Sequence, residues 1–436
     1  MQSRNMRFRL APLALAAHLL MGGAAFAQSA PGTQGPLTPA PNAALSEQID
    51  TRARAIEDKL IAWRRDIHQH PELGNQETRT AKLVADHLRA LGMDVKTGVA
   101  GTGVVAVLKG GKPGPVVALR ADMDALPVKE QVDVPFASKA KGTYLGKEVD
   151  VMHACGHDTH TAILMATAEV LAGMKDELPG SVKFIFQPAE ESPADFEPDG
   201  KKIWGAKMMV QEGVLDNPKV DAIFGLHVSS AYPAGWLSWR SGPAMAAADQ
   251  FWIDVTGKQT HGARPWSGID PIVVSSQIIL GLQTIASRQI NSMLEPAVIT
   301  VGAIHGGNRM NIVPDSVAMT GTIRTYDEGM KKDIHQRITR TADMIAQSAG
   351  AKADVRVVEL YNATVNNPRP DRENGVDPAA RGGRRQLWPA TQVHRLGGLF
   401  LLSGKGAGHV LLPGRDAQGH RRGQGRAQPF PALLRG

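Results

Sequence analysis

Short apolar runs alternate with segments of helical periodicity from Ser46 onward, and this alternation constrains the fold more than any other feature. Apolar residues spaced by three, four or seven positions predict a first helix from Ser46 that ends near His70-Pro71, because proline restricts the residue before it. Further helices are predicted over 78–91, 158–172 and 203–212, and buried strands over 103–108, 115–119, 181–186 and 220–228. Strands that alternate with helices indicate an α/β domain.

The pattern changes near Gln250. Asp270 is predicted as the N-cap of a helix, with Pro271 in its first turn. The predicted elements are a strand over 251–256, this helix to 287, strands over 297–303 and 316–325, a helix over 328–348 and a strand over 353–360. The order β-α-β-β-α-β is the split βαβ, ferredoxin-like arrangement. We therefore predict a domain over 46–248, to which the chain returns at 361–368, and an inserted α+β domain over 249–360.

The first 27 residues have the features of a secretory signal peptide. Three arginines precede an apolar run over 10–26, and Ala25-Phe26-Ala27 forms a small-x-small cleavage pattern. Residues 28–45 are rich in Pro, Gly and Ala and are expected to be a flexible leader. No other stretch is long and apolar enough to span a membrane. We expect a soluble periplasmic or secreted protein.

The formal net charge of +7 would suggest a nucleic-acid partner, but the position of the basic residues argues against one. Residues 369–436 hold 12 Lys and Arg against 4 Asp and Glu, whereas the rest of the chain is slightly acidic. The sequence contains no basic stripe with interleaved aromatic residues of the kind that binds single strands. We therefore predict no nucleic-acid partner.

The single cysteine, Cys155, stands in MHACGHDTH, beside His157. An exported protein exposes a lone thiol to oxidation, so the cysteine is either buried and inert or a metal ligand. Cys-Gly-His in extended backbone would direct two ligand side chains to one side, and Gly156 would allow a tight bend. A helix N-terminus and a bound cation would both lower the pKa of the thiol. A satisfied core cluster remains the alternative.

Two adjacent carboxylates end the predicted strand KFIFQPAEES. Glu190 and Glu191 lie at its carboxyl end, which is where α/β proteins bind ligands. Their side chains would point in different directions in extended backbone, so that one would hold a metal and the other would act as a general base. A solvated acidic loop is the alternative.

Other strand ends carry further polar residues. Asp122 and Asp124 in RADMDALP are placed to orient a ligand histidine. His227 in FGLHV would be structural if it stood alone, but together with the other clusters it becomes a candidate ligand. Residues 64–77 hold two histidines and a glutamate near a helix end, where capping and packing explain them adequately.

The predicted inserted domain offers a substrate-binding set. His261 lies in the glycine-flanked loop TGKQTHGARPW, and Asn311 and Arg324 follow. An imidazole, an amide and a cation are suited to a substrate carboxylate and a developing oxyanion.

Six motifs follow one another between residues 46 and 368: RRDIHQHPELG, RADMDALP, MHACGHDTH, QPAEE, FGLHV and HGARPW. Together they resemble the hippurate hydrolase and indole-acetyl-amino-acid hydrolase family, metal-dependent amidohydrolases related to carboxypeptidases. The resemblance implies a zinc-peptidase-like catalytic domain with a central mixed sheet flanked by helices, and an inserted lid domain that forms a homodimer. It also implies two divalent ions per subunit (Zn, Mn, Co or Ni) and a small N-acyl amino acid, such as hippurate, as the substrate.

The resemblance also implies residue roles. The residues that look like metal ligands are Cys155, His157, Glu191 and His227, with Cys155 as a bridging thiolate. Glu190 looks like the general base, which would take a proton from water and return it to the leaving amine. His261 looks like the oxyanion-stabilising residue, reaching a partner subunit's site, and the substrate carboxylate would contact Asn311 and Arg324.

The resemblance stops at Pro368. The family's return to its catalytic domain carries Gly-Ser-Glu-Asp-Phe and Asn-His-Ser-Pro, whose histidine is the last metal ligand, and neither motif occurs here. Codons can be chosen for 395–408 and 428–436 that spell both motifs one base along. We therefore predict a frameshift between Pro368 and Arg395, with a divergent natural tail as the alternative.

The missing histidine leaves two further functions open. One is a catalytically impaired or dead binding protein, and the other is a dipeptidase or carboxypeptidase. The tail offers His394, His409 and His420 as substitutes, but no predicted element places them.

Overall fold

The computed structural model describes residues 43–196, 202–231, 237–240, 242–367, 387–389 and 407–410. The predicted signal peptide, most of the predicted leader and most of the basic tail, including His394 and His420, lie outside the described residues. Within these ranges, no helix combines the length and the apolar character needed to cross a bilayer.

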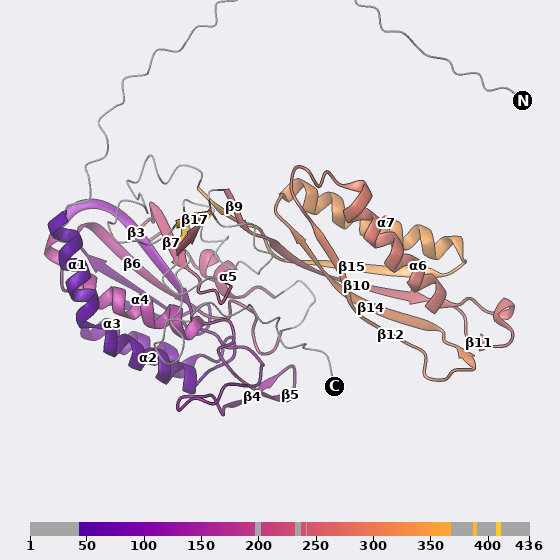
Figure 1. Ribbon diagram of the computed structural model, residues 1–436, viewed down its shortest axis with the longest axis horizontal. Helices are drawn as coiled ribbons and strands as arrows, with labels where there is room; N and C mark the ends of the chain where they lie inside the picture. Colours follow the sequence, from indigo (N-terminus) through magenta and orange to yellow (C-terminus); the bar gives the residue numbers. More distant parts are fainter. Residues whose placement is uncertain are drawn as a thin grey trace, which may run out of the picture. The chain divides into compact units, whose positions relative to one another are not determined.

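Six strands form a mixed sheet in the order β1-β2-β6-β3-β7-β18 (Figure 1). They are β1 (Asp94–Val99), β2 (Gly103–Lys109), β3 (Lys112–Asp122), β6 (Pro179–Gln187), β7 (Ala222–Leu226) and β18 (Ala407–Val410). The pairs β1–β2 and β2–β6 are antiparallel, whereas β3 runs parallel to β6 and β7. β18 adds to β7 in parallel and places His409 opposite Gly225 in the ladder. The predicted α/β class with a central mixed sheet is confirmed.

Helices pack on both faces of this first sheet because its side chains alternate. The helices are α1 (Ala43–Ala55), α2 (Glu57–Gln69), α3 (Thr78–Ala90), α4 (His157–Ala172) and α5 (Gly205–Gln211). In β6, Phe184 and Phe186 are fully buried in a core with α2, α3 and α4. Ile185, between them, packs instead with Ala206 and Met209 of α5. Successive strand residues point to opposite faces, so one strand serves two cores.

The single helix predicted from Ser46 is wrong in two respects. α1 already begins at Ala43, within the predicted leader, and helical geometry is interrupted at Ile56, where φ is −100° and ψ is 0°. Ile56 is buried in a cluster with Ala166 and Val170 of α4. The interruption therefore coincides with the point at which the chain packs against α4.

A second, four-stranded sheet has the order β12-β14-β10-β15, and all its neighbours are antiparallel (Figure 1). Its elements follow in the predicted β-α-β-β-α-β order: β10 (Ala247–Thr256), α6 (Pro271–Thr284), β12 (Val298–Gly306), β14 (Ser316–Thr325), α7 (Glu328–Ser348) and β15 (Lys352–Tyr361). Asp270 caps α6 as predicted, because its side chain accepts from the N–H groups of Ile272 and Val273. The sheet has a core of its own, in which Phe251 packs with Ile278 and Ile334 of the two helices.

Several short elements were not predicted, because two to four residues carry too little periodicity. They are β4 (Lys141–Tyr144), β5 (Lys147–Asp150), β8 (Leu237–Trp239), β9 (Gly242–Met245), β11 (Thr260–His261), β13 (Ile312–Val313), β16 (Thr364–Asn366), β17 (Leu387–Pro389) and the π-helical turn Ile285–Gln289 after α6. They pair as β4–β5, β11–β13, β16–β9 and β17–β8. The predicted end of α6 at 287 falls inside the π-helical turn.

Candidate metal centre

The carboxyl ends of three parallel strands bring the predicted site together. The ladder sets Asp122 of β3 opposite Gln187 of β6, and Arg120 opposite Gly225 of β7. The loops that follow these strands therefore start at neighbouring positions along one edge of the sheet, where ligands bind in open α/β sheets. Glu190 follows β6, and His227 follows β7.

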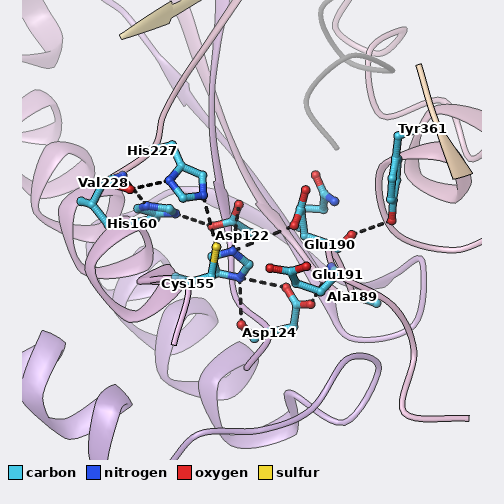
Figure 2. A network of polar contacts seen from close by, with 12 residues as sticks. Asp122, Asp124, Cys155, His160, Ala189, Glu190, Glu191, His227, Val228 and Tyr361 are labelled. Atoms are coloured by element: carbon cyan, nitrogen blue, oxygen red, sulfur yellow. Dashed lines mark hydrogen bonds and ion pairs between the residues drawn. The ribbon is translucent and has the colours of Figure 1, made fainter. Parts of the chain in front are cut away.

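The Cys155-His157 segment bends at Gly156, as predicted, but it is not extended. Gly156 adopts a left-handed φ of 93°, and α4 begins at the next residue. A Cβ atom on Gly156 would lie 2.4 Å from Cγ2 of Val228, so glycine is needed both for the conformation and for the close approach. The bend leaves Sγ of Cys155 3.4 Å from Nε2 of His227 (Figure 2).

Asp124 fixes the orientation of the His157 ring. Nδ1 of His157 lies 2.8 Å from the carbonyl oxygen of Asp124 and 3.2 Å from its Oδ1. Both partners are acceptors, so Nδ1 carries a proton and donates it. Nε2 is buried and has no hydrogen-bond partner within the described ranges. A buried nitrogen without a partner, backed by a carboxylate on the other side of the ring, is the arrangement of a metal-ligating histidine.

His160 is held differently, and sequence reasoning assigned it no role. Its Nε2 accepts from the N–H of Val228 at 2.9 Å, which makes Nδ1 the donor to Oδ1 of Asp122 at 2.6 Å (Figure 2). Asp122 is also paired with Arg120 at 2.6 Å. Both ring nitrogens of His160 are thus engaged, so we assign it to the scaffold that joins β3, α4 and the loop after β7.

Three sets of side chains each place their ligand atoms within 4.8 Å of one another, and all three include His157. Their other members are Cys155 with His227, Asp122 with His160, and Glu190 with Glu191. Both carboxylates of the last set reach the same histidine, so the predicted divergence of the Glu-Glu pair is wrong. The backbone turns there because Ala189 has a φ of 45°, and its N–H donates to Oε1 of Glu77 at 2.7 Å.

Burial and mutual charge perturb the groups of the centre. Burial, reinforced by the Glu191 carboxylate, raises the pKa of Glu190 to about 8. Burial raises the pKa of the Cys155 thiol to about 11. Burial lowers the pKa of His227 well below its ordinary value, so its ring is neutral and its Nε2 lone pair is available. Burial opposes a charge on His157, but Asp122 and Asp124 outweigh it and raise that pKa.

These residues fit divalent cations. The centre combines a thiol, two imidazole nitrogens and two carboxylates, the mixed S, N and O set that first-row divalent metals accept. Positive charge at this position would lower the raised pKa values of Cys155 and Glu190, because it favours their anionic forms. It would also engage the otherwise partnerless Nε2 of His157.

The sequence model of the family described as peptidase family M20/M25/M40 matches residues 118–367, more than half of the chain. This chain belongs to that family. N-acyl-L-amino acid amidohydrolase of Geobacillus stearothermophilus is 37% identical over 392 residues, 89% of this chain and 99% of the relative. Thermostable carboxypeptidase 1 of Saccharolobus solfataricus is 45% identical over 326 residues, 74% of this chain and 78% of the relative.

A solved structure supports the same assignment. The Bacillus subtilis YXEP protein, described as a dinuclear metal-binding peptidase of the M20 family, aligns with a TM-score of 0.67 and 34% identity over 83% of this chain and 89% of its own. The chain therefore belongs to a family of metal-dependent hydrolases and has the mixed α/β fold of its relatives.

Of the three substrate-binding residues predicted in the inserted domain, only Arg324 lies near the candidate metal centre. Arg324, at the end of β14, lies within electrostatic range of Glu191: burial lowers its pKa, and the carboxylates of Asp249 and Glu191 counteract that. His261 is exposed on β11, and Asn311 lies beside it, since Gly262 donates to its carbonyl oxygen at 2.8 Å. Across the described ranges, neither is recorded in contact with the centre.

Some supporting contacts escaped sequence reasoning. His68, in the segment explained by packing, lies 2.8 Å from Asp158 through Nδ1 and 2.8 Å from Glu130 through Nε2. Tyr361 donates from its hydroxyl to the carbonyl oxygen of Glu190 at 2.5 Å and accepts from Nε1 of Trp204 at 2.8 Å (Figure 2). The motif RRDIHQHPELG was a local signal for His68, whereas nothing near Tyr361 pointed to a residue 171 positions away.

Proposed function

We propose that this M20 chain hydrolyses the amide bond of N-acyl amino acids, with Glu190 as the general base. The observation that carries the proposal is the position of His157, which belongs both to the set with Cys155 and His227 and to the set with Glu190 and Glu191. Its buried Nε2 makes no hydrogen bond within the described part of the chain and lies 3.7 Å from Oδ2 of Asp122 and 4.0 Å from Oε2 of Glu190. The name of the Geobacillus stearothermophilus relative supports this substrate class.

The proposal gives each residue of the centre a role. Cys155, His157, Glu191 and His227 would hold the two divalent ions, which would supply Lewis acidity and lower the pKa of a water molecule. Glu190 accepts the proton of the attacking water and passes it to the nitrogen of the leaving amine. Asp124 keeps the ring of His157 in the ligating tautomer.

Substrate contacts form the next part of the proposal. Arg324 pairs with the carboxylate of the amino-acid half, since it is a cation within range of Glu191. His261 and Asn311 take part from a partner subunit, with residues 249–360 as the lid and dimerisation domain. Nδ1 of His261 accepts from the N–H of Ala263 at 3.0 Å, which makes Nε2 the protonated nitrogen that an oxyanion needs. Light scattering that shows only monomer would contradict this arrangement.

The test of Glu190 is the substitution Glu190→Gln, which keeps size and hydrogen bonding but removes the base. In a version of the chain whose reading frame after Pro368 is restored, we expect kcat on N-acylglycines to fall about 10²–10⁴-fold with unchanged metal content, because general-base catalysis contributes roughly that factor. Glu148→Gln, an exposed change in β5, is the matched control. Full activity of Glu190→Gln would refute the role.

Carboxypeptidase activity is the second candidate, favoured by the names of the Saccharolobus solfataricus relatives. A panel of N-acyl amino acids and dipeptides, assayed with Mn, Co, Ni or Zn, separates the two. Hydrolysis of dipeptides alone would replace the first proposal.

The end of the family match supports a frameshift proposal. The M20 model stops at residue 367, beside the predicted break after Pro368, whereas the alignment with the Geobacillus stearothermophilus relative covers 89% of this chain and therefore runs beyond that point. We propose that a frameshift between Pro368 and Arg395 removed the last metal-ligating histidine, so that the chain as it stands binds substrate with impaired or no turnover. Sequencing the gene and comparing kcat of the chain with that of a frame-restored version decide this. Codons that do not yield both missing motifs one base along would exclude it.

Export remains a proposal as well. The charged head, apolar run and cleavage pattern of residues 1–27 support cleavage after Ala27 and a periplasmic or secreted location. N-terminal sequencing of the mature protein from cell fractions tests both.

A further inference from the structure

His68 lies near the end of α2, in the motif RRDIHQHPELG, which has no part in the proposed reaction. Its ring is 6% exposed and lies between two carboxylates: Nδ1 is 2.8 Å from Oδ2 of Asp158, and Nε2 is 2.8 Å from Oε2 of Glu130. Ionised carboxylates only accept hydrogen bonds, so both ring nitrogens donate and the ring is positively charged. Burial opposes this charge, but the bond to Asp158 outweighs it and raises the pKa of His68. His68 therefore joins α2 both to α4 and to the segment between β3 and β4.

Two arginines of α2 extend this arrangement in different ways. Nε of Arg64, one turn before His68, lies 2.9 Å from Oδ2 of Asp158. The guanidinium groups of Arg64 and Arg65 lie over the ring of Phe136, at 5.2 and 5.1 Å from its centroid. Within the described ranges, only the first of these two arginines pairs with the aspartate. The buried carboxylates thus face an imidazolium and a guanidinium, and such pairing is the condition under which buried charges are tolerated.

Asp158 lies in the first turn of α4, directly after the candidate ligand His157. It is fully buried, and its charged bonds to α2 require one geometry. The apolar packing between the two helices, in which Ile67 lies with Leu164 and Met165, is less directional. The charged bonds therefore fix the rotation of the first turn of α4. A different rotation of this turn would carry Nε2 of His157 away from the other ligand candidates.

The same motif supports His157 from a second direction. Leu73 forms a bridge with Ala125, whose N–H donates to the carbonyl oxygen of Glu72 at 2.8 Å. Ala125 directly follows Asp124, which holds Nδ1 of His157. The motif thus contacts both the residue that follows the histidine and the residue that follows its orienting aspartate.

We propose that His68 is a positioning residue of the metal centre, which acts through Asp158 to hold the first turn of α4 so that His157 faces the other ligands. The inference rests on the proposed metal-dependent function, because it concerns how the ligands are held. It gives the motif RRDIHQHPELG a role beyond capping and packing. Metal affinity is the property that should respond, because replacing residues that orient ligands changes it about 10–100-fold.

The experiment compares His68→Asn with His68→Gln. The amide nitrogen of asparagine takes the position of Nδ1 and can donate to Asp158, whereas that of glutamine takes the position of Nε2 and can donate to Glu130. Both variants lose the ring and its charge. Titration of the full chain with Co(II) under reducing conditions gives Kd, and the absorption of the thiolate–cobalt bond reports on Cys155. We expect His68→Asn to stay within about threefold of the native Kd and His68→Gln to weaken binding about tenfold, with weaker absorption.

A second pair tests the contact with Asp158 at more exposed positions of α2. Arg64→Met removes a partner of this aspartate and a cation over Phe136, whereas Arg65→Met removes only a cation over the same ring. Only Arg64→Met should weaken Co(II) binding, by about threefold. If neither histidine variant folds, this pair decides.

Several outcomes would overturn the inference. They are a Kd for His68→Gln no weaker than that for His68→Asn, and equal Kd values for the two arginine variants. Failure of the proposed function looks different, because then the native chain itself gives no thiolate–cobalt absorption, and the inference falls with it.

Discussion

Ala189 is the residue that turns both carboxylates towards His157, and Glu77 holds it there. Glu77 is fully buried, accepts from the N–H of Ala189 at 2.7 Å and accepts from the hydroxyl of Thr102. Burial, with the nearby Asp124 carboxylate, raises the pKa of Glu77 to about 8 from 4.5. A side chain remote in sequence from the carboxylates thus fixes the direction in which they point.

This pKa makes stability depend on pH. Between pH 4.5 and about 8 the folded state binds a proton at Glu77 that the unfolded chain has released. The stabilisation is therefore complete below pH 4.5 and is lost as the pH rises through about 8. Glu77→Gln, which cannot ionise, should lose less stability than the native chain over this range in urea unfolding. Parallel curves for the two proteins would contradict the shifted pKa, and Glu148→Gln is the exposed control.

At the residue scale, the sequence was enough to predict which residues are ligand candidates. It was not enough to predict the directions in which their side chains point. Cys155, Glu190 and Glu191 stand in motifs with local signals, whereas the left-handed conformations of Gly156 and Ala189 depend on distant partners. Val228 crowds the first and Glu77 anchors the second. A bend at Gly156 was predicted, although without the partner that fixes it, whereas the turn at Ala189 was not predicted.

At the element scale, a lysine inside β6 joins the sheet to the loop that precedes β7. Lys183 is 1% exposed, and its Nζ donates to the carbonyl oxygens of Val214, Asn217 and Pro218 at 2.8, 3.0 and 2.9 Å. Burial lowers its pKa. The charge is tolerated in the sheet because three carbonyl groups surround it.

Lys183→Met should therefore destabilise the fold. Methionine preserves the apolar stem but leaves three carbonyl groups without their donor, and we expect a loss of about 2–3 kcal/mol in the free energy of unfolding. Urea titration measures it, with the exposed Lys109→Met in β2 as the control. A loss no larger than that of Lys109→Met would show that water replaces the ammonium group.

The last strand of the second sheet reaches Glu190, the proposed general base. Tyr361, the final residue of β15, donates to the carbonyl oxygen of Glu190 at 2.5 Å. Tyr361→Phe removes this donor without removing the ring, so we expect kcat to fall about tenfold with KM nearly unchanged, since an error in positioning affects the transition state most. Trp204→Phe, which removes the donor to Tyr361, should have a smaller effect in the same direction. An unchanged kcat would assign Tyr361 a packing role only.

Helices and strands with strong hydrophobic periodicity were predicted well, whereas the pairing of strands within the sheets was not. α7 was predicted at its observed bounds, Glu328–Ser348, because its apolar stripe spans 21 residues. The order β1-β2-β6-β3-β7 had no counterpart in the prediction, since parallel pairing between β3 and β6 joins residues about 65 positions apart. Periodicity reports which face of a segment is buried, but not which segment covers it.

On the scale of the whole molecule, the two sheets have separate hydrophobic cores, and the metal centre belongs to the first of them. Its members lie between residues 122 and 227, at the end of β3, in the first turn of α4 and in the loops after β6 and β7, which the fold alone brings together. Ions that bind these loops bind the folded chain and not the unfolded one.

Metal loading should therefore raise the melting temperature. At a concentration of about 100 times Kd, one site contributes about 2.7 kcal/mol, which corresponds to a shift of about 5 °C for a domain of this size. Scanning calorimetry of the protein with Zn or Mn, then with excess chelator, should show the rise and its reversal. His157→Ala should abolish the shift, and a native chain that melts at one temperature under all these conditions would exclude a metal centre.

The β4–β5 hairpin turns through Leu145 and Gly146, both with positive φ, and contributes no strand to the first sheet. Residues that build the reaction centre are tied to the register of β3, β6 and β7, where an inserted residue would displace several of them together. The hairpin is not tied to this register. Its turn can be lengthened, shortened or exchanged while the pairing of β3, β6 and β7 stays intact. The length of this turn can therefore vary without displacing the residues of the candidate metal centre.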